Sequence, residues 1–330
     1  MCCKLFLAKS ELDDRRPLVA CVNGDTICAD CCNECRKRPD GKCPTCDDDL
    51  LPTPIVNKVL MGLIENCASL LEIPFKEIEM EEKPLVSGGF GKVYKAKWHK
   101  ENVVIKVIKA VSEEEEVAVK CEAKLTLRLR HPNVIRLFGI THVKNTKHGI
   151  VMEEAKHGSL DIWIGKIDHG KLTEIALGIV DGLIYVHSQH VIHRDIKPQN
   201  ILMFGPEGDM IPKIADFGVS KVIETTIKTR TKVGHEIYMA PEVKMFAPYG
   251  LPADIFSLAI TLFEMFNKQL ISESSDEMRR FVFMVHGGRI GEIPQSCKVP
   301  VYLLLMIKRG WAYNPDNRPT LSEYYSVLRG

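Results

Sequence analysis

Two short stretches in the second half of the chain contain residue types that could carry out chemistry. The stretch VIHRDIKPQNILM contains Asp195, Lys197 and Asn200, and KIADFG contains Asp216. Two carboxylates and an amide oxygen are suitable ligands for Mg²⁺, and a carboxylate can also accept the proton of a hydroxyl group. Any one of these residues alone is most simply a polar group of a surface loop. Their combination in this order favours metal binding and hydroxyl activation.

A glycine-rich stretch earlier in the chain has the pattern of a phosphate-binding turn. KPLVSGGFGKVYKAKWHKENVVIKVIK starts at Lys83, and apolar residues alternate on both sides of SGGFG. This alternation predicts two strands joined by a turn, and glycines there let backbone N–H groups approach a phosphate. Lys106, at the end of VVIK, is placed where a cation could hold phosphates. The two halves of the pattern together predict nucleotide binding.

The cysteines are concentrated at the N-terminus. Nine of the twelve cysteines lie in the first 46 residues, at positions 2, 3, 21, 28, 31, 32, 35, 43 and 46. The N-terminal sequence MCCKLFLAKSELDD has too short an apolar core for a secretory signal, and paired C-x-x-C spacing is typical of metal sites. The pattern therefore favours a metal-binding module over a secreted disulfide scaffold.

Helices and strands of a large globular core must position these groups, and the composition of the chain is compatible with such a core. A chain of 330 residues predicts about two domains, and its 45% hydrophobic and 26% charged residues are ordinary for a globular protein. The net charge of +1 gives no reason to expect a nucleic-acid partner. No apolar stretch is long enough to predict a membrane span. We therefore expect a soluble, intracellular and cytoplasmic protein.

Taken together, the motifs from about residue 78 to 330 resemble a eukaryotic protein kinase domain, and their order is that of the family throughout. The resemblance implies an α+β, bilobal protein kinase fold that uses ATP and Mg²⁺ and acts on protein substrates. The expected boundaries are an N-lobe over about 78–155 and a C-lobe over about 156–330. A small zinc-binding domain over 1–66 and a linker over 67–77 precede them.

The resemblance assigns roles to the residues that carry the motifs. Asp195 matches the carboxylate that accepts the substrate hydroxyl proton, and Lys197 is placed near the transferred group. Asn200 and Asp216 match the two Mg²⁺ ligands. The expected catalytic residues are Asp195, Lys197, Asn200, Lys106 and its carboxylate partner Glu122.

A nucleotide site follows from the same resemblance. Met152 matches the gatekeeper, and the hinge is expected at Glu153-Glu154-Ala155. Met152 taken alone would more often be a core methionine. The expected nucleotide-binding residues are Leu85, Val86, Gly88, Phe90, Gly91, Val93, Val104, Lys106, Met152, Glu153, Ala155, Leu202 and Asp216.

Motif details narrow the class of kinase. The segment DIKPQN, with Lys197 two positions after the aspartate, resembles serine/threonine kinases. The segments GSLDIWI, HPNVIRLFGI and RGWAYNPDNRPT resemble the tyrosine-kinase-like group. The resemblance also implies that Glu242 pairs with Arg318 and that Asp254 anchors a buried apolar helix.

Two positions depart from the family pattern. Val86 replaces the first glycine of the phosphate-covering loop, which implies weaker ATP binding or slower turnover. His235 replaces the threonine of GTxxYMAPE, whose hydroxyl ties the substrate-binding segment to the catalytic residues. This replacement leaves serine/threonine specificity open. A pseudokinase scaffold, in which nucleotide only switches conformation, is therefore the alternative function.

The segment before GHEIYMAPE predicts regulation by phosphorylation. It carries four threonines, and Arg194 precedes the catalytic aspartate, so a phosphothreonine could pair with that arginine and order the segment. The simpler alternative is a mobile polar loop that happens to be rich in threonine. The expected regulatory residues are Arg194, Thr225, Thr226, Thr229 and Thr231.

The N-terminal cysteines resemble the later part of a RING finger, which binds two zinc ions in a cross-braced arrangement. Cys43 and Cys46 match the last ligand pair, Cys28 and Cys31 the middle pair, and Cys21 the third ligand. Asp25 stands in NGDTIC where a histidine is usual, and its carboxylate can also ligate zinc, so that one site becomes Cys₃Asp. The segment PIVNKVLMGLIEN predicts a closing helix over residues 54–66.

The first ligand pair of a RING finger has no clear counterpart. Cys2 and Cys3 do not begin a C-x-x-C pair, so the second zinc site needs a ligand from elsewhere, with Cys2, Cys3, Cys32 and Cys35 as candidates. The module would serve partner binding or, through ubiquitin-conjugating enzymes, ubiquitin transfer. The domain order leaves open whether it acts on other proteins, acts on the kinase itself or forms a homodimer. A ubiquitin ligase whose kinase domain regulates or recruits targets is a further alternative.

Overall fold

The computed structural model describes most residues from 72 onward and three short strands before them. The described residues are 17–21, 26–28, 50–56, 72–88, 91–109, 123, 126–143, 147–217, 237–245, 249–273, 275–276, 280, 284 and 297–330. The chain divides into two compact units. The first comprises Met1–Arg128 and Leu137–Met152, and the second comprises Leu129–Arg136 and Glu153–Gly330.

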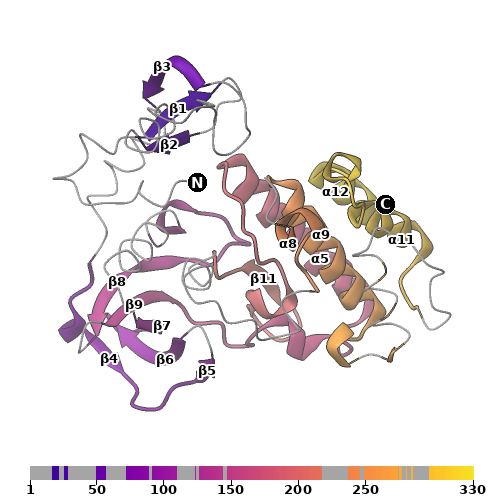
Figure 1. The fold of residues 1–330 in the computed structure, drawn as a ribbon. Helices are drawn as coiled ribbons and strands as arrows, with labels where there is room; N and C mark the ends of the chain where they lie inside the picture. The colour runs from indigo at the N-terminus through magenta and orange to yellow at the C-terminus, as the bar shows by residue number, and fades with distance from the viewer. Residues whose placement is uncertain are drawn as a thin grey trace. The chain divides into compact units, whose positions relative to one another are not determined.

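A six-stranded sheet forms the main part of the first unit. Its strands are β4 (Ile78–Met80), β5 (Val86–Gly88), β6 (Gly91–Trp98), β7 (Glu101–Lys109), β8 (Leu137–Val143) and β9 (Lys147–Glu153). Their order is β4-β6-β7-β9-β8, with β5 paired to β6 (Figure 1). Val103, Ile105 and Val107 alternate along β7 and pack with Ile78 and Val151 in one buried cluster. These β-branched residues favour the extended backbone and also form the core.

The predicted glycine-rich hairpin is confirmed. Strands β5 and β6 pair antiparallel, with Val86 opposite Val93 and Gly88 opposite Gly91. Gly91 has a φ of +125°, and a Cβ atom there would lie 2.5 Å from the carbonyl oxygen of Val107. Glycine is therefore required at this position both by its backbone conformation and by the close approach of β7.

Near the N-terminus, β1 (Pro17–Cys21), β2 (Thr26–Cys28) and β3 (Leu50–Val56) form a sheet of their own, in the order β2-β1-β3. Cys28 pairs with Pro17, four positions along β1 from Cys21. At about 3.3 Å per residue, the Cα atoms of the two cysteines are roughly 13 Å apart.

The helix predicted for residues 54–66 is wrong at its start. Residues 54–56 belong to β3, where Ile55 pairs with Val19 of β1. The β-branched Ile55 and Val56 favour a strand, and pairing with β1 decides for it. Residues 57–66 lie outside the described residues.

Helices dominate the second unit. Within the described residues the α-helices are α5 (His169–Ser188), α8 (Pro241–Lys244), α9 (Pro252–Asn267), α11 (Val301–Gly310) and α12 (Leu321–Arg329). Figure 1 shows α5, α9, α11 and α12 packed together in one bundle. Strands β10 (Ile201–Phe204) and β11 (Ile211–Ile214) form an antiparallel hairpin, and the short 3₁₀ helix η5 (Pro198–Asn200) precedes β10.

Helix α9 is the most deeply buried element of this unit. Every residue from Ala253 to Asn267 is buried, so the prediction of a buried core helix is confirmed. Among the helices in the described part of the chain, none has the length and apolar composition that crossing a bilayer requires. A sheet-rich part followed by a helical part is the α+β, bilobal arrangement that the resemblance implies, and this expectation is confirmed for the kinase-like part of the chain. The expected RING-like domain falls mostly on residues outside those described.

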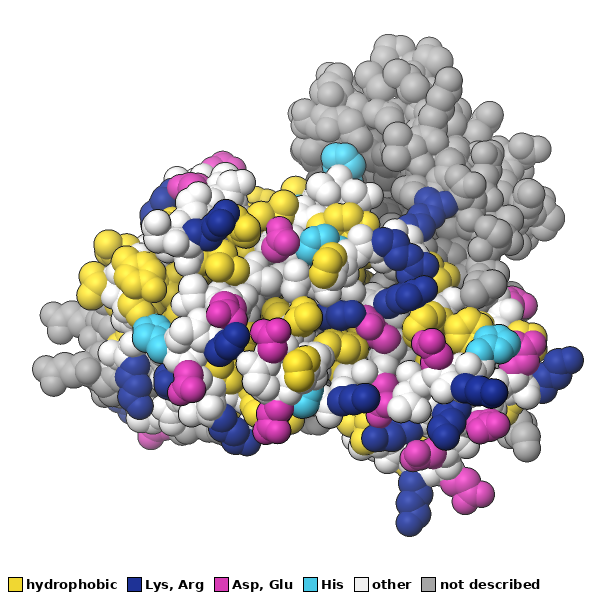
Figure 2. Space-filling model, turned by 180° about the vertical axis from the view of Figure 1, so that it is seen from behind, with side chains coloured by type: hydrophobic (Ala, Val, Ile, Leu, Met, Phe, Trp, Pro, Cys, Tyr) yellow, Lys and Arg dark blue, Asp and Glu magenta, His cyan; other side chains and the backbone are white. Residues whose placement is uncertain are grey.

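The surface has no large region of one charge on the face shown in Figure 2. Lys, Arg, Asp and Glu side chains are interspersed there, as the net charge of +1 would allow. Such mixing provides no extended field for a polyanionic partner on that face.

Candidate active site

The loop that follows α5 brings three of the predicted catalytic side chains together. Asn200 donates two hydrogen bonds through Nδ2, one to the carboxylate Oδ2 of Asp195 at 2.7 Å and one to its carbonyl oxygen at 2.8 Å. Nζ of Lys197 lies 2.7 Å from the same Oδ2 atom. Pro198 begins η5, which turns the chain back so that Asn200 faces Asp195. The carboxylate of Asp195 is therefore held in one orientation by an amide and a cation.

Asp216 is placed next to this loop by the end of β11. The backbone N–H of Ala215 donates to the carbonyl oxygen of Asn200 at 2.8 Å, which brings the residue before Asp216 against η5. Asp216 has a φ of +65°, in the left-handed region that non-glycine residues rarely adopt. Such strained conformations are retained where the surroundings enforce them, and they concentrate at functional sites.

The donor set at this point fits Mg²⁺. Both hydrogen bonds of the Asn200 side chain use Nδ2, so its Oδ1 is the atom suited to a metal ion, and Asp216 supplies a carboxylate. Hard cations such as Mg²⁺ prefer these oxygen ligands. Among the described residues, no group of three or more His, Cys, Asp or Glu side chains is arranged to hold a metal ion. The pair of Asn200 and Asp216, with one amide and one carboxylate, is a different kind of site from such a cluster.

Asp254 of α9 anchors the catalytic loop from below. Its carboxylate accepts backbone N–H groups of His193 and Arg194, both at 2.8 Å, and Nε2 of His187 at 2.9 Å. Complete burial by itself would raise the pKa of Asp254, but the hydrogen bond from His187 and the interactions with His193 lower it below its usual value. Asp254 is therefore a carboxylate that joins the buried helix α9 to this loop, in line with the expectation that it anchors that helix.

His193 connects the loop to the segment that carries Asp216, a connection that the sequence reasoning missed. Its Nε2 lies 3.0 Å from the carbonyl oxygen of Ala215, and its Nδ1 accepts the N–H of Asp195 at 3.2 Å. These partners define a neutral ring that is protonated on Nε2. Burial lowers the pKa of His193, although the neighbouring carboxylates oppose this effect. The feature of the sequence that could have indicated this role is the position of His193, two residues before Asp195.

Phe217 packs on the other side of this histidine. The ring centroids of His193 and Phe217 are 4.8 Å apart, and both residues are buried. The aromatic contact fixes the chain immediately after Asp216. The loop of Asp195 and the turn of Asp216 are thus connected in three ways. These are the hydrogen bond from Ala215 to Asn200, the contact of His193 with the carbonyl oxygen of Ala215, and the packing of His193 on Phe217.

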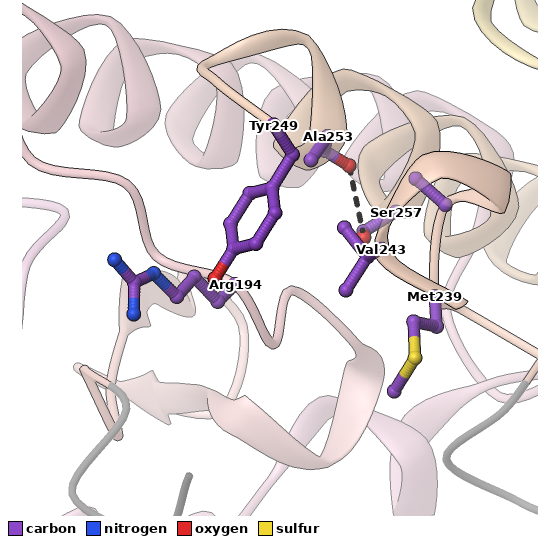
Figure 3. Close-up of a pocket in the computed structure, with 7 residues that line it drawn as sticks. Arg194, Met239, Val243, Tyr249, Ala253 and Ser257 are labelled. Carbon is purple, nitrogen blue, oxygen red and sulfur yellow. Dashed lines mark hydrogen bonds between the residues drawn. The ribbon is translucent and has the colours of Figure 1, made fainter. Parts of the chain in front are cut away.

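Arg194 lies beside a small pocket next to this loop. Figure 3 shows the ring of Tyr249 extending toward Arg194, whose guanidinium carbon is 5.4 Å from the ring centroid. The pocket has a volume of about 10 Å³, which admits at most a single water molecule. The Oγ of Ser257 on its wall lies 2.7 Å from the carbonyl oxygen of Tyr238, to which it donates, and 3.2 Å from that of Ala253. This pocket is a packing gap and not a ligand site.

A buried ion pair links α8 to the segment before α12. Arg318 donates to both carboxylate oxygens of Glu242, at 2.6 and 2.8 Å, across 76 positions of sequence. The predicted pairing of these residues is confirmed. A two-point contact of this kind holds α8 near the end of the chain, because a planar guanidinium matches a carboxylate.

The predicted nucleotide-binding residues are distributed over both units. The first unit contains Leu85, Val86, Gly88, Gly91, Val93, Val104, Lys106 and Met152. The second unit contains Glu153, Ala155, Leu202 and Asp216. Lys106 lies on β7 opposite Val93 of β6, one strand from the glycine-rich hairpin. In the second unit, the carboxylate of Glu153 accepts two hydrogen bonds from Lys213 at 2.8 Å, so its side chain serves the framework.

Several predicted site residues lie outside the described residues. They are Cys2, Cys3, Asp25, Cys31, Cys32, Cys35, Cys43, Cys46, Phe90, Glu122, Thr225, Thr226, Thr229, Thr231 and His235.

Comparison with known proteins gives a family for this arrangement. Residues 80–327 match the family model described as "Protein kinase domain". The chain is 30% identical over 265 residues to the probable serine/threonine-protein kinase gdt4 of Dictyostelium discoideum. The aligned residues cover 78% of this chain and 16% of that protein. It is 32% identical over 266 residues to human mitogen-activated protein kinase kinase kinase 7, covering 78% of this chain and 42% of that protein.

A plant relative matches to a similar degree. The serine/threonine/tyrosine-protein kinase HT1 of Arabidopsis thaliana is 29% identical over 253 residues, covering 73% of this chain and 63% of that protein. The chain thus spans less than two thirds of the length of each of these three relatives.

Proposed function

The chain belongs to the protein kinase family, and on this premise we propose that it transfers the γ-phosphate of ATP to serine and threonine hydroxyl groups of protein substrates. The observation that carries the proposal is the carboxylate of Asp195, which Asn200 and Lys197 both hold at 2.7 Å. The family implies ATP and Mg²⁺. The names of gdt4 and HT1 support serine and threonine as acceptors, and the name of HT1 adds tyrosine.

Each residue of the cluster has a chemical task in this proposal. Asp195 accepts the proton of the substrate hydroxyl, whose oxygen attacks the γ-phosphorus while the bond to the leaving ADP oxygen breaks. Asn200 and Asp216 hold Mg²⁺, which supplies positive charge to the phosphates when bound. Lys197 stands beside Asp195, where a cation can neutralise charge on the transferred group.

The remaining proposed roles rest on motif position. Lys106, with Glu122 as its partner, holds the α- and β-phosphates, and the hairpin around Gly88 and Gly91 covers them. Residues Leu85, Val86, Phe90, Val93, Val104, Met152, Glu153, Ala155 and Leu202 line the nucleotide site in this proposal. Phosphorylation of Thr225, Thr226, Thr229 or Thr231 provides a charge for Arg194.

Intact-mass measurement tests the main proposal. The purified full chain is incubated with ATP and Mg²⁺ in the presence of casein, and Asp195→Asn serves as the matched variant of nearly equal shape. We expect phosphate on the wild-type chain or on casein and none with Asp195→Asn. A wild-type chain that binds nucleotide but transfers no phosphate to either protein would support the scaffold alternative instead.

The acceptor residue is tested separately, because His235 replaces the usual threonine. We expect phosphoserine and phosphothreonine in the products after acid hydrolysis. A predominance of phosphotyrosine would contradict the proposed acceptor class while leaving the kinase activity intact.

For the N-terminal module, we propose a zinc site formed by Cys21, Asp25, Cys43 and Cys46, and a second one that includes Cys28 and Cys31. The cysteine spacing supports this assignment, and so does the β1–β2 register. The register separates Cys21 from Cys28 by roughly 13 Å, as expected for ligands of two different ions. Structural zinc ions would provide folding energy to the module.

Metal analysis of the purified chain tests the zinc proposal. We expect Cys43→Ser with Cys46→Ser to lower the zinc content by about one ion per chain, whereas Cys297→Ser retains the wild-type content. Equal zinc content in both variants would contradict the proposed ligands. Ubiquitin chains formed with active conjugating enzymes would favour the ligase alternative, and an absence of chains from a zinc-loaded protein would oppose it.

A further inference from the structure

The short 3₁₀ helix η4 (Leu160–Trp163) of the second unit carries a buried carboxylate oxygen. This atom is Oδ1 of Asp161, and no group in the described part of the chain donates a hydrogen bond to it. A buried acceptor without a donor is unfavourable, most of all when it carries charge. Such an atom in a folded protein calls for an explanation, and a ligand that brings positive charge provides one.

The framework of the second unit places Asp161 beside the catalytic loop. Ser159, two positions before it, pairs with Leu202 of β10 in an isolated antiparallel bridge. The backbone N–H of Met203 donates to the carbonyl oxygen of Gly158 at 2.8 Å. Strand β10 directly follows η5, the 3₁₀ helix of the catalytic loop, and η4 packs against η5. The unsatisfied oxygen is therefore next to the elements that position the proposed base.

A buried tyrosine beside Asp161 cannot supply the missing donor. The hydroxyl of Tyr238 donates its single proton to Oε2 of Glu264 at 2.7 Å. Burial and the carboxylate of Glu264 raise the pKa of this hydroxyl, and the negative charge of Asp161 adds to the effect. The other carboxylate oxygen of Glu264 accepts the N–H of Ile271 at 2.8 Å. Glu264 thus has donors for both oxygens, and Asp161 is the carboxylate suited to an incoming cation.

The carboxylate of Asp161 can be approached from solvent. The residue as a whole is half-buried, although its Oδ1 atom is enclosed. The two oxygens of a carboxylate share one negative charge, so a cation on the exposed side also compensates the buried oxygen. The next residue, Ile162, is 51% exposed. It offers apolar surface to the methylene stem of a lysine or arginine.

A basic side chain fits this site better than a metal ion. Metal ions in proteins are commonly held by three or four side chains, and the described residues contain no such group of His, Cys, Asp or Glu. A lysine or arginine needs only one carboxylate and an apolar surface for its stem. Because Asp161 lies beside the catalytic loop, the molecule that brings this cation is the protein substrate.

We propose that Asp161 binds a lysine or arginine of the protein substrate close to the acceptor hydroxyl, and this inference rests on the kinase activity proposed above. Asp161 is then a residue that determines specificity. The chain's own threonine segment has the composition of such a substrate, because residues 228–232 read KTRTK. A second copy of the chain is therefore one substrate of this class.

Peptide kinetics with the full chain test the proposal. The probe is the synthetic peptide IETTIKTRTKVG, which copies residues 223–234, and its neutral counterpart is IETTIQTQTQVG. With ATP and Mg²⁺, we expect kcat/KM to be at least about 10-fold higher for the basic peptide, chiefly through a lower KM, because a hydrogen bond between charged groups is among the stronger ones.

An isosteric variant locates the recognition. Asp161→Asn removes the charge and should lower kcat/KM for the basic peptide at least about 10-fold, which brings the two peptides to nearly equal values. Asp168→Asn makes the same change at an exposed aspartate seven positions further on and should retain the wild-type preference.

Charge reversal gives a result that a folding defect cannot imitate. Asp161→Lys should prefer the acidic peptide IETTIETETEVG over the basic one, because the new ammonium group attracts carboxylates and repels cations. A loss of folded protein would lower the rates for both peptides and leave their ratio unchanged.

Fluorescence anisotropy separates this proposal from the kinase activity. The fluorescein-labelled basic peptide is titrated with Asp195→Asn, and then with the same chain carrying Asp161→Asn in addition. We expect the second protein to bind at least about 10-fold more weakly. If no peptide receives phosphate while this difference in binding persists, the proposed kinase activity fails and the cation site stands.

Three outcomes would overturn the proposal. Equal kcat/KM and equal binding for the basic and neutral peptides would show that no cation is recognised. A basic preference that Asp161→Asn leaves intact would place the recognition at another residue. An equal loss of preference in Asp168→Asn and Asp161→Asn would indicate general electrostatic attraction and not a defined site.

Discussion

Nδ2 of Asn200 lies within hydrogen-bonding distance of both the carboxylate and the carbonyl oxygen of Asp195, at 2.7 and 2.8 Å. One side chain therefore orients the proposed base and presents its remaining oxygen as a metal ligand. A single amide thus contributes both to positioning and to charge stabilisation. These are the two main requirements of phosphoryl transfer.

Asn200→Ala should lower kcat by at least about 100-fold and raise the Mg²⁺ concentration needed for half-maximal rate, because both functions of the amide are lost. The measurement is phosphate transfer to casein over a range of Mg²⁺ concentrations. Asn317→Ala, at an exposed asparagine of the same unit, is the control and should behave as the wild type. An unchanged Mg²⁺ dependence in Asn200→Ala would contradict its role as a metal ligand.

Arg318→Met should destabilise the protein by about 3–5 kcal/mol, because it leaves the Glu242 carboxylate buried without its partner. Arg309→Met removes the exposed pair with Glu323 and should cost less than about 1 kcal/mol. Urea unfolding followed by circular dichroism measures both. Adding Glu242→Gln to Arg318→Met should recover part of the loss, and equal effects of the two single variants would contradict the importance of burial.

Gly91→Ala should destabilise the protein by about 1–3 kcal/mol, because the positive φ and the Val107 carbonyl oxygen leave no room for a Cβ atom. Gly170→Ala is the matched substitution near the start of α5, where nothing lies within 4 Å of the new atom. It should stabilise the protein by about 0.4–1 kcal/mol. Thermal denaturation distinguishes them, since the two shifts in Tm are expected to have opposite signs.

Stability should fall as the pH is lowered from 7.5 to 5.5, because the pKa of His193 is lowered in the folded protein. The unfolded chain, with a pKa near 6.5, takes up the proton first, so acid favours unfolding. Protonation would also replace the Nδ1 lone pair that accepts the N–H of Asp195. His193→Gln should show a smaller decrease over this pH range in urea unfolding, whereas His190→Gln, at an exposed histidine, should retain the wild-type slope.

Below that range a second loss is expected. The pKa of Asp254 is also lowered by folding, so its contribution is present above the usual carboxylate pKa and disappears as the pH falls through the folded value. A protein whose stability stayed constant from pH 7.5 to 3 would contradict both assignments.

Local spacing is what allowed much of the site to be predicted. Asp195, Lys197 and Asn200 lie within six consecutive residues, so any compact turn brings their side chains together. The SGGFG hairpin could be predicted equally well, since the alternation of apolar residues and the glycine content specify a strand, a turn and a strand. The buried helix around Asp254 was expected from the family resemblance of ADIFSLAITLFEMF, and the structure shows Ala253–Asn267 buried.

The sequence by itself determined the family, the catalytic motifs and the main elements, because each of these depends on residues close together in the chain. Only the tertiary structure decided that His193 connects the loop to Ala215, that Lys213 binds Glu153 across 60 positions and that Oδ1 of Asp161 is buried with no hydrogen-bond partner among the described residues. It also decided that residues 54–56 form a strand, since pairing with β1 outweighs a helical pattern. Contacts between distant segments depend on how whole elements pack, and no local periodicity records that packing.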